Sequence, residues 1–326
     1  MALPKVFVTR RIPEAGLDIL RKVAEIDVWE GELPPPYETL IERSRGAAGL
    51  LSLLSDRVDG PLMDSAGPQL KVIANYAVGY DNIDITAATA RRIPVGNTPG
   101  VLTETTADFA WALLMAAGRR VAEGDRYTRA GHWKTWGPSI LLGRDVFGAT
   151  LGIIGFGRIG QALARRAKGF SMRILYYDTQ RFPQAETELG AQYAPLDTVL
   201  SEADYVSLHT ALTAETRHLI GAAQFARMKS TAVLVNTSRG PVVDEAALFL
   251  ALSSGQIASA GLDVTEIEPL PMDSPLLKLQ NIILAPHIAS ASVQSRTRMA
   301  TMAAENIAAG LADQRLPTCA NPQVYE

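Results

Sequence analysis

The sequence predicts an α/β protein with parallel sheets in two lobes, and three observations lead to this prediction. Short apolar runs alternate with longer helical patterns along most of the chain, which is typical of βαβ units. The alternation becomes irregular between residues 118 and 149 and then resumes as a second series. The length of 326 residues also corresponds to about two domains, at roughly 150 residues each.

The first series runs from the amino terminus to about residue 98. The run AGLLSLL at 48–54 has no charged side chain, as expected of a strand covered on both faces. A helix is expected after Pro34 to Pro36, because proline is tolerated in the first turn of a helix. The other expected elements are strands at 5–10, 26–29 and 71–76 and a helix at 14–23.

The second series opens with a long helix that is expected after Pro99–Gly100. Its apolar side chains recur at helical spacing, at Ala107, Ala110, Trp111, Leu114 and Met115. Strands are then expected at 149–155, 173–178, 204–209, 232–237, 258–264 and 281–286, and an alanine-rich helix at about 290–313.

Composition is that of a globular protein and excludes several classes. Apolar residues make up 47% and charged residues 20%, which excludes a disordered or fibrous chain. A net charge of −3 argues against a broad nucleic-acid surface. No run of about 18 apolar residues could span a membrane, and the start does not resemble a secretory signal. The single cysteine, Cys319, fits a reducing compartment, so we expect a cytoplasmic protein without membrane contact.

The strongest chemical signal is the turn Gly155-Phe156-Gly157-Arg158-Ile159-Gly160. A G-x-G-x-x-G pattern alone could be any glycine-rich turn, but this one follows an apolar strand and opens a helix. Its first glycine, Gly155, makes the turn, Gly157 lets the backbone approach a pyrophosphate, and Gly160 permits close helix–strand packing. The pattern predicts a dinucleotide site.

Asp178 ends the next expected strand, 23 positions after Gly155. A carboxylate there accepts hydrogen bonds from ribose hydroxyls and repels a 2′-phosphate, so NAD(H) is favoured over NADP(H). Arg181 lies three residues further on and could offset that repulsion, which leaves NADP(H) open.

Three candidate catalytic residues follow the expected ends of strands in the second series. Arg239 could engage a carboxylate and a carbonyl oxygen, or it could form a surface ion pair. His287 could donate a proton, although a lone histidine at a strand end is more often structural. Glu268 could be a solvated loop charge, or it could favour the imidazolium form of His287. Their shared sheet edge favours the catalytic interpretation of all three.

The chain resembles the D-isomer-specific 2-hydroxyacid dehydrogenases, and within them the glyoxylate/hydroxypyruvate reductases. The spacing from Arg239 to Glu268 is 29 and from Glu268 to His287 is 19, as expected of the catalytic Arg, Glu and His of those reductases. The resemblance covers nearly the whole chain and is carried by LLSDRVD (53–59), AVGYDNID (77–84), NTPGVLTETTAD (97–108), GIIGFGRIGQALARR (152–166), NTSRGPVVDE (236–245), AGLDVTEIEPLP (260–271) and APHIASAS (285–292).

The resemblance implies Rossmann-like or flavodoxin-like lobes, in which a nucleotide-binding domain (99–287) is inserted into a substrate-binding domain (1–98 plus 288–326). It implies that backbone N–H groups of the loop Ala77-Val78-Gly79-Tyr80 hold the substrate carboxylate, with Leu54 and Ser55 nearby. The positions that it implies for cofactor contact, besides the glycines, are Thr106, Arg158, Ile159, Asp178, Thr237, Asp263 and Ser290.

A homodimer is also implied, with a tryptophan of the 133–136 segment reaching the neighbouring subunit's pocket. The alternative for Trp133 and Trp136 is ordinary packing. The chain departs from many relatives at Ala289, where they have glycine, and it has Val78 where phosphite-oxidising relatives carry lysine.

The sequence therefore predicts an NAD(P)H-dependent reductase of small 2-keto acids such as glyoxylate or hydroxypyruvate. Two alternatives stay open: a dehydrogenase of a bulkier D-2-hydroxy acid, and a non-catalytic NAD-sensing protein of the same fold. Of the other histidines, His209 is expected to pack at the cofactor edge, His218 to lie on a surface and His132 to lie near the tryptophan segment. No cluster of His, Cys and carboxylates has the spacing of metal ligands.

Overall fold

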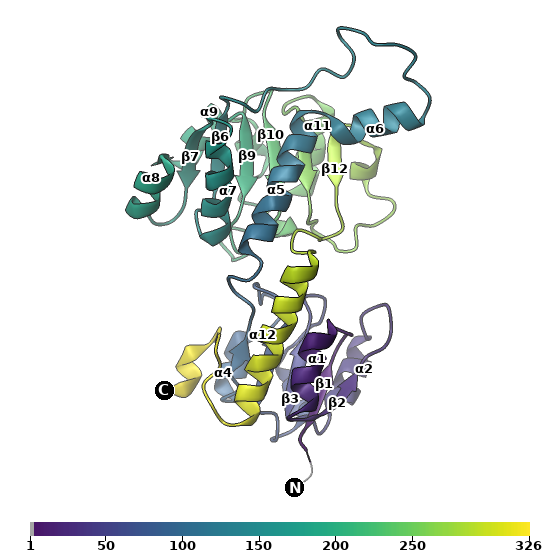
Figure 1. Ribbon diagram of the computed structural model, residues 1–326, viewed down its shortest axis with the longest axis vertical. Coiled ribbons are helices and arrows are strands. Elements are labelled where there is room, and N and C mark those ends of the chain that lie inside the picture. Colours follow the sequence, from purple (N-terminus) through teal and green to yellow (C-terminus); the bar gives the residue numbers. More distant parts are fainter. Residues whose placement is uncertain (1–2) are drawn as a thin grey trace. The chain divides into compact units, whose positions relative to one another are not determined.

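The computed structural model describes residues 3–326 and forms two compact units. One unit comprises the chain up to Leu102 together with Ala291–Glu326, and the other comprises Thr103–Ser290. Each unit is built around its own parallel sheet (Figure 1). The predicted fold class, α/β with parallel sheets in two lobes, is therefore confirmed. Within residues 3–326, no helix is both long and apolar enough to cross a membrane.

The first unit contains a five-stranded sheet in the order β2-β1-β3-β4-β5, which is the flavodoxin-like arrangement. The long helix α12 packs against α1, β3 and β4, so the carboxyl-terminal segment completes the core of this unit. The strands are β1 (Lys5–Val8), β2 (Glu25–Val28), β3 (Gly49–Ser52), β4 (Val72–Asn75) and β5 (Val95–Gly96), and the helices are α1 (Glu14–Arg21), α2 (Tyr37–Ser44), α3 (Gly60–Ala66), α4 (Ile85–Ala90) and α12 (Val293–Leu311).

The second unit contains a seven-stranded sheet in the order β12-β11-β10-β9-β6-β7-β8. Chain order reverses beside β6, which is the switch point at which open α/β sheets bind ligands. The strands are β6 (Thr150–Ile154), β7 (Arg173–Tyr177), β8 (Ala191–Tyr193), β9 (Tyr205–Leu208), β10 (Val233–Asn236), β11 (Ser259–Leu262) and β12 (Ile282–Leu284). The helices are α5 (Thr103–Gly118), α6 (Val121–Arg129), α7 (Arg158–Lys168), α8 (Pro183–Leu189), α9 (Leu196–Glu202), α10 (Ala222–Phe225) and α11 (Glu245–Ser253).

Both faces of the seven-stranded sheet are buried. On β6, Ile153 packs with residues of α5 and α7, whereas Ile154 packs with residues of α9 and α11 on the opposite face. Leu151–Ile154 is therefore buried throughout, and so is Gly49–Ser52 of β3, within the run at 48–54 for which the sequence predicted coverage on both faces. The two short edge strands β5 and β8 were not predicted, because two or three residues leave no periodic pattern.

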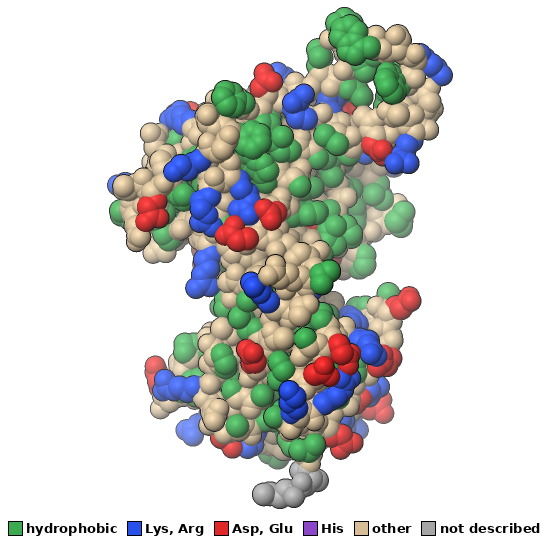
Figure 2. All heavy atoms as spheres, viewed as in Figure 1, with side chains coloured by type: hydrophobic (Ala, Val, Ile, Leu, Met, Phe, Trp, Pro, Cys, Tyr) green, Lys and Arg blue, Asp and Glu red, His purple; other side chains and the backbone are tan. Residues whose placement is uncertain are grey.

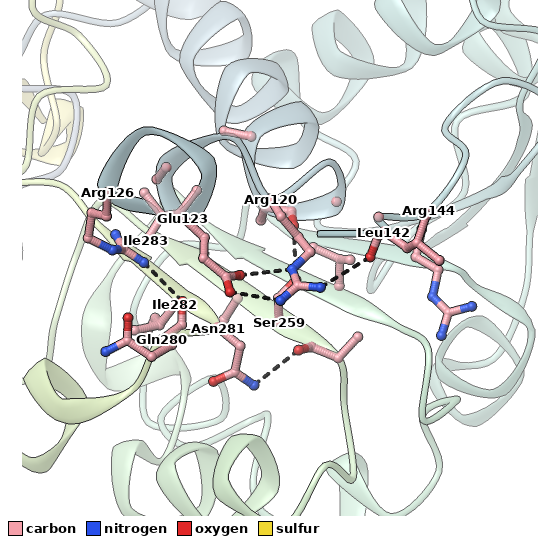
Figure 3. Close-up of a pocket in the computed structure, with 18 residues that line it drawn as sticks. Arg120, Glu123, Arg126, Leu142, Arg144, Ser259, Gln280, Asn281, Ile282 and Ile283 are labelled. Atoms are coloured by element: carbon pink, nitrogen blue, oxygen red, sulfur yellow. Dashed lines mark hydrogen bonds and ion pairs between the residues drawn. The ribbon is translucent and has the colours of Figure 1, made fainter. Parts of the chain in front are cut away.

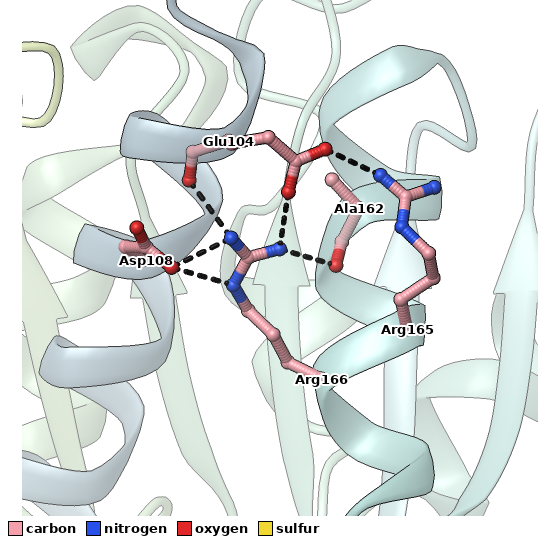
Figure 4. Close-up of polar contacts among 5 residues, drawn as sticks. All are labelled: Glu104, Asp108, Ala162, Arg165 and Arg166. Carbon is pink, nitrogen blue, oxygen red and sulfur yellow. Dashed lines mark hydrogen bonds and ion pairs between the residues drawn. The ribbon is translucent and has the colours of Figure 1, made fainter. Parts of the chain in front are cut away.

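An ion-pair network joins α5 to α7, the helix that follows the glycine turn (Figure 4). Arg166 donates to the Asp108 carboxylate at 2.6 Å and to Glu104 at 3.0 Å, and Arg165 donates to the other Glu104 oxygen. Burial alone would raise the pKa of Glu104, but the two arginines outweigh it and lower that pKa. The network fixes α7 laterally against α5.

Candidate active site

The glycine turn leads from β6 into α7 at the switch point of the sheet. Gly155 has φ +90°, and a side chain there would meet the backbone of His209 and Thr210. A side chain on Gly160 would collide with the carbonyl oxygen of Gly155. Around Gly157, by contrast, no atom lies within 4 Å of the position that a Cβ would occupy. The first turn of α7 has no side-chain cap, so its N–H groups are available to an anion.

Unsatisfied hydroxyl groups lie at the same edge of the sheet. Thr210 follows β9 and Thr237 follows β10, and the Oγ1 atom of each is buried without a hydrogen-bond partner in the structure. Buried hydroxyls normally have hydrogen-bond partners. These two could therefore bind the polar groups of a ligand. The glycine turn and these hydroxyls together fit a dinucleotide.

Asp178 follows β7 on the other side of the turn. One of its carboxylate oxygens accepts the Phe156 N–H at 2.7 Å, and the other has only long contacts, of 3.3 and 3.4 Å, with Thr179 and Gln180. The neighbouring Arg181 is held by Glu186 at 2.6 Å. Its charge is therefore already compensated, which the sequence did not reveal.

Glu268 and His287 form a hydrogen-bonded pair. The Nδ1 atom of His287 lies 2.7 Å from Oε2 of Glu268, while Oε1 of Glu268 accepts the Thr265 N–H at 3.1 Å. Burial would raise the pKa of Glu268, but the hydrogen bond and charge of His287 outweigh it, helped by Arg239, and the pKa falls below its ordinary value. Glu268 thus stays ionised beside the ring and orients it. No hydrogen bond within residues 3–326 uses Nε2 of His287, which leaves it available to a substrate.

Asp263 fixes the backbone of the His287 segment. Its carbonyl accepts the His287 N–H at 2.9 Å, and its carboxylate accepts the N–H groups of Ile288 and Ala289 at 2.7 Å each. These bonds hold His287 in the left-handed region, at φ 55°. Burial raises the pKa of Asp263 in spite of them. The cofactor contact that the resemblance implied for Asp263 stays a prediction, and the structure shows this support of the His287 backbone.

Arg239 lies in the loop after β10, which abuts the loop after β11. A side chain on Gly240 would collide with the backbone of Thr265, so only glycine allows this approach. The side chain of Asn236 donates to the carbonyl of Arg239 at 2.9 Å and fixes the loop. The structure therefore brings Arg239, Glu268 and His287 together at one edge of one unit.

The remaining predicted cofactor positions lie in the same unit. Thr106 is buried in α5, Arg158 and Ile159 open α7, and Ser290 ends the unit. His209 contacts Ser207 at 2.9 Å, and burial lowers its pKa to about 3, which fits a neutral packing residue.

The predicted substrate loop belongs to the first unit, directly after β4. The carbonyls of Ala77, Val78 and Gly79 accept hydrogen bonds from the Thr98 N–H and from the side chains of Asn97 and Asn75, each at 2.8 Å. No hydrogen bond within residues 3–326 uses the N–H groups of Val78, Gly79 or Tyr80. Leu54 and Ser55 follow β3, and Arg10 contacts the Ser55 hydroxyl at 2.9 Å. The roles of Asn75 and Asn97 were not predicted.

A cavity of about 280 Å³ lies at the amino ends of the strands of the seven-stranded sheet, at the edge opposite to the glycine turn (Figure 3). It is lined by the first residues of β10 and β11, Val233 and Ser259, and by arginines of α6 and its neighbours. Arg120 forms a bidentate pair with Glu123, and Arg126 donates to the carbonyl of Gln280 at 3.0 Å. Arg120 and Arg126 are therefore satisfied, and none of the catalytic candidates lines this cavity. Within residues 3–326, no group of three or more His, Cys, Asp or Glu residues could hold a metal ion.

Comparisons with known proteins identify the family of this chain. Residues 111–289 match the family described as the D-isomer specific 2-hydroxyacid dehydrogenase, NAD binding domain. The chain belongs to the D-isomer specific 2-hydroxyacid dehydrogenases. It is 58% identical over 324 residues to a glyoxylate reductase of Korarchaeum cryptofilum, covering 99% of this chain and 97% of that one. It is 53% identical over 327 residues to a glyoxylate reductase of Thermococcus gammatolerans, with the same coverage.

Solved structures of similar proteins have the same fold as this dehydrogenase. A Thermus thermophilus protein named TT0316 superposes with a TM-score of 0.91 at 47% identity, covering 97% of this chain and 99% of that one. An NADPH-dependent glyoxylate/hydroxypyruvate reductase from Sinorhizobium meliloti, solved with NADP and malonate, gives a TM-score of 0.88 at 34% identity and 98% coverage of both chains. The resemblance noted in the sequence is confirmed, and the chain is an oxidoreductase.

Proposed function

We propose that this dehydrogenase reduces small 2-keto acids, with glyoxylate and hydroxypyruvate as the first candidates and NADH as the preferred cofactor. The observation that carries the proposal is the Glu268–His287 pair at 2.7 Å, within the electrostatic range of Arg239. A proton donor, a carboxylate that keeps it charged and a guanidinium are what a keto-acid reductase needs besides a hydride. Relatives named glyoxylate reductase support the substrate class.

Each residue has a defined part in the proposed mechanism. NADH, when bound, supplies the hydride to the keto carbon. His287 donates its proton from Nε2 to the carbonyl oxygen, and Glu268 holds the ring and stabilises the imidazolium before transfer. Arg239 polarises the carbonyl and binds the carboxylate. As the resemblance implies, the N–H groups of Val78, Gly79 and Tyr80, which no hydrogen bond within residues 3–326 uses, would hold a substrate carboxylate, with Leu54 and Ser55 nearby.

The NADH preference rests on Asp178, whose charge opposes a 2′-phosphate. Arg181 does not offset that charge, because Glu186 already pairs with it. The remaining proposed cofactor contacts are Thr106, Gly155, Gly157, Arg158, Ile159, Gly160, Thr237, Asp263 and Ser290.

We also propose a cytoplasmic homodimer in which an apolar arm, residues 133–147, covers a second copy. Trp133, Trp136, Leu142 and Phe147 on this arm are all more than 60% exposed, and Figure 2 shows hydrophobic side chains gathered there. Several large apolar side chains exposed on one segment are typical of a contact surface for another protein chain. Sedimentation of a Trp133→Ser/Trp136→Ser variant tests the proposal: it should dissociate to a monomer, and an unchanged dimer would remove the arm's role.

The function is tested with purified protein by following NADH or NADPH absorbance against glyoxylate, hydroxypyruvate, pyruvate and a bulkier keto acid. Faster turnover of the first two with NADH supports the proposal. Preference for the bulky acid would reassign the substrate. Cofactor binding without any turnover would instead indicate a binding protein.

A further inference from the structure

A second histidine–carboxylate pair lies one loop away from the catalytic dyad. Nε2 of His218, in the loop after β9, contacts Oε1 of Glu266, two residues before Glu268. His218 and His287 share an uncommon backbone conformation, with φ of 53° and 55°. Left-handed residues other than glycine are infrequent and gather at functional sites, where the surrounding structure holds them in place.

His218 connects the two loops that carry the catalytic side chains. Its N–H donates to the carbonyl of Pro241 at 2.8 Å, and the Ile220 N–H donates to Val242 at 3.1 Å, which fastens the His218 loop to the segment after Arg239. Its ring holds Glu266 in the segment that carries Glu268. His218 therefore links the two catalytic loops, through its backbone N–H on one side and its ring on the other.

Besides the bonds of Glu268 to His287 and to the Thr265 N–H, two further side-chain bonds constrain the segment that carries Glu268. The Glu266 N–H donates to Glu245 Oε1 at 2.5 Å, and the Thr265 hydroxyl donates to the carbonyl of Ile267 at 2.8 Å. The contact between His218 and Glu266 is the side-chain bond that ties this segment to the His218 loop. Its loss would leave Glu268 on a less constrained loop.

Glu266 lies in the electrostatic neighbourhood of the dyad, because its charge and that of Glu268 both act on Glu245. Burial raises the pKa of Glu245, and the charges of Glu266 and Glu268 raise it further, so the three carboxylates sense one another. The charged groups that face the dyad besides Glu266 are Arg239, Asp263 and Glu245. In an ionic pair, the imidazolium form of His218 would neutralise Glu266. Without it, the net field at His287 is more negative, and without Glu266 it is less negative.

We propose that His218 and Glu266 are an ionic positioning pair that holds the Glu268 segment and sets the pH range over which His287 delivers its proton. This inference rests on the proposed function of Glu268 and His287. Reduction needs a protonated His287, so turnover falls on the alkaline side as that ring loses its proton.

The test is the pH dependence of kcat in His218→Asn and Glu266→Gln, since asparagine tolerates the left-handed backbone of residue 218. Glu266→Gln should move the alkaline limb to lower pH and His218→Asn to higher pH, each by roughly half a pH unit at low salt. The matched control is Glu215→Gln, which removes an exposed carboxylate from the same loop and should move neither limb. Unmoved limbs, or limbs that move in the same direction, would overturn the proposal, because a purely structural pair lowers kcat without opposite shifts.

NMR titration separates this inference from the proposed function. The chain has four histidines, so a His287→Gln variant assigns the ring signals of His287 directly. In His218→Asn and in Glu266→Gln, the midpoint of the His287 titration should move in the same direction as the alkaline limb of kcat. The NMR measurement does not depend on turnover. Full turnover by His287→Gln would reject the proposed function, and a fixed His287 midpoint in both His218→Asn and Glu266→Gln would reject the pair.

Discussion

The two edges of the seven-stranded sheet differ in what they leave unsatisfied. The amino-end edge has the cavity of about 280 Å³, yet its Arg120 and Arg126 are paired with a carboxylate and a carbonyl. The carboxyl-end edge has the glycine turn, the unpartnered hydroxyls of Thr210 and Thr237, and the Glu268–His287 pair. Unsatisfied polar groups and an oriented proton donor, rather than cavity volume, therefore support the site that we propose at the carboxyl ends of the strands.

The largest difference in kcat between substitutions at the two edges is expected from His287→Gln. Loss of the proton donor should lower kcat by about 10²–10⁴-fold, the usual contribution of general acid catalysis. NADH binding, measured by fluorescence titration, should persist, because the glycine turn is unchanged. Arg126→Gln at the amino-end edge is the matched control and should keep turnover within about twofold. Loss of NADH binding in His287→Gln would instead indicate a structural role for the ring.

The glycine turn gives the next contrast, within one edge. Gly157→Ala has open space around it, so the melting temperature should hardly change while NADH binding weakens by roughly tenfold or more, because the methyl group occupies the path of the pyrophosphate. Gly160→Ala collides with Gly155 and should destabilise the fold itself. Calorimetry and NADH titration of both variants check this. Equal loss of stability in the two would show that Gly157 is structural.

Cofactor choice gives a smaller effect at the same edge. Asp178→Asn keeps an acceptor for the Phe156 N–H and removes the charge, so kcat/KM with NADPH should rise relative to NADH by roughly tenfold. Adding Glu186→Gln should release Arg181 and raise the ratio further. Glu188→Gln, an exposed neighbour in α8, is the control for the second change. An unchanged ratio would mean that Asp178 does not select the cofactor.

The strands and the glycine turn at the carboxyl-end edge were predictable from the sequence, whereas the hydrogen bonds that support this edge were not. Apolar runs such as Leu151–Ile154 identify doubly covered strands, and glycines with a following helix identify the turn, because both are local patterns. The short strands β5 and β8 leave no such pattern.

Tertiary partners were not predictable in the same way. His218 meets Glu266 across 48 positions of the chain, and Asn97 reaches back to Val78 across 19, so no spacing rule finds either contact. Asp263 shows the same limit. Its backbone bonds to Ile288 and Ala289 depend on how β11 and β12 pair, which the sequence does not reveal.

The smallest effect is expected at the amino-end edge, from Arg120→Gln. The Arg120 guanidinium is 39% exposed, and its bond to Glu123 spans a single helical turn, so the free energy of unfolding should fall by only about 0.5 kcal/mol. The kcat and the NADH affinity should match those of the parent protein, which steady-state kinetics and urea unfolding would measure together. A severalfold loss of kcat in a normally folded variant would contradict the comparison, because it would place chemistry at the edge where every described arginine of α6 already has a partner.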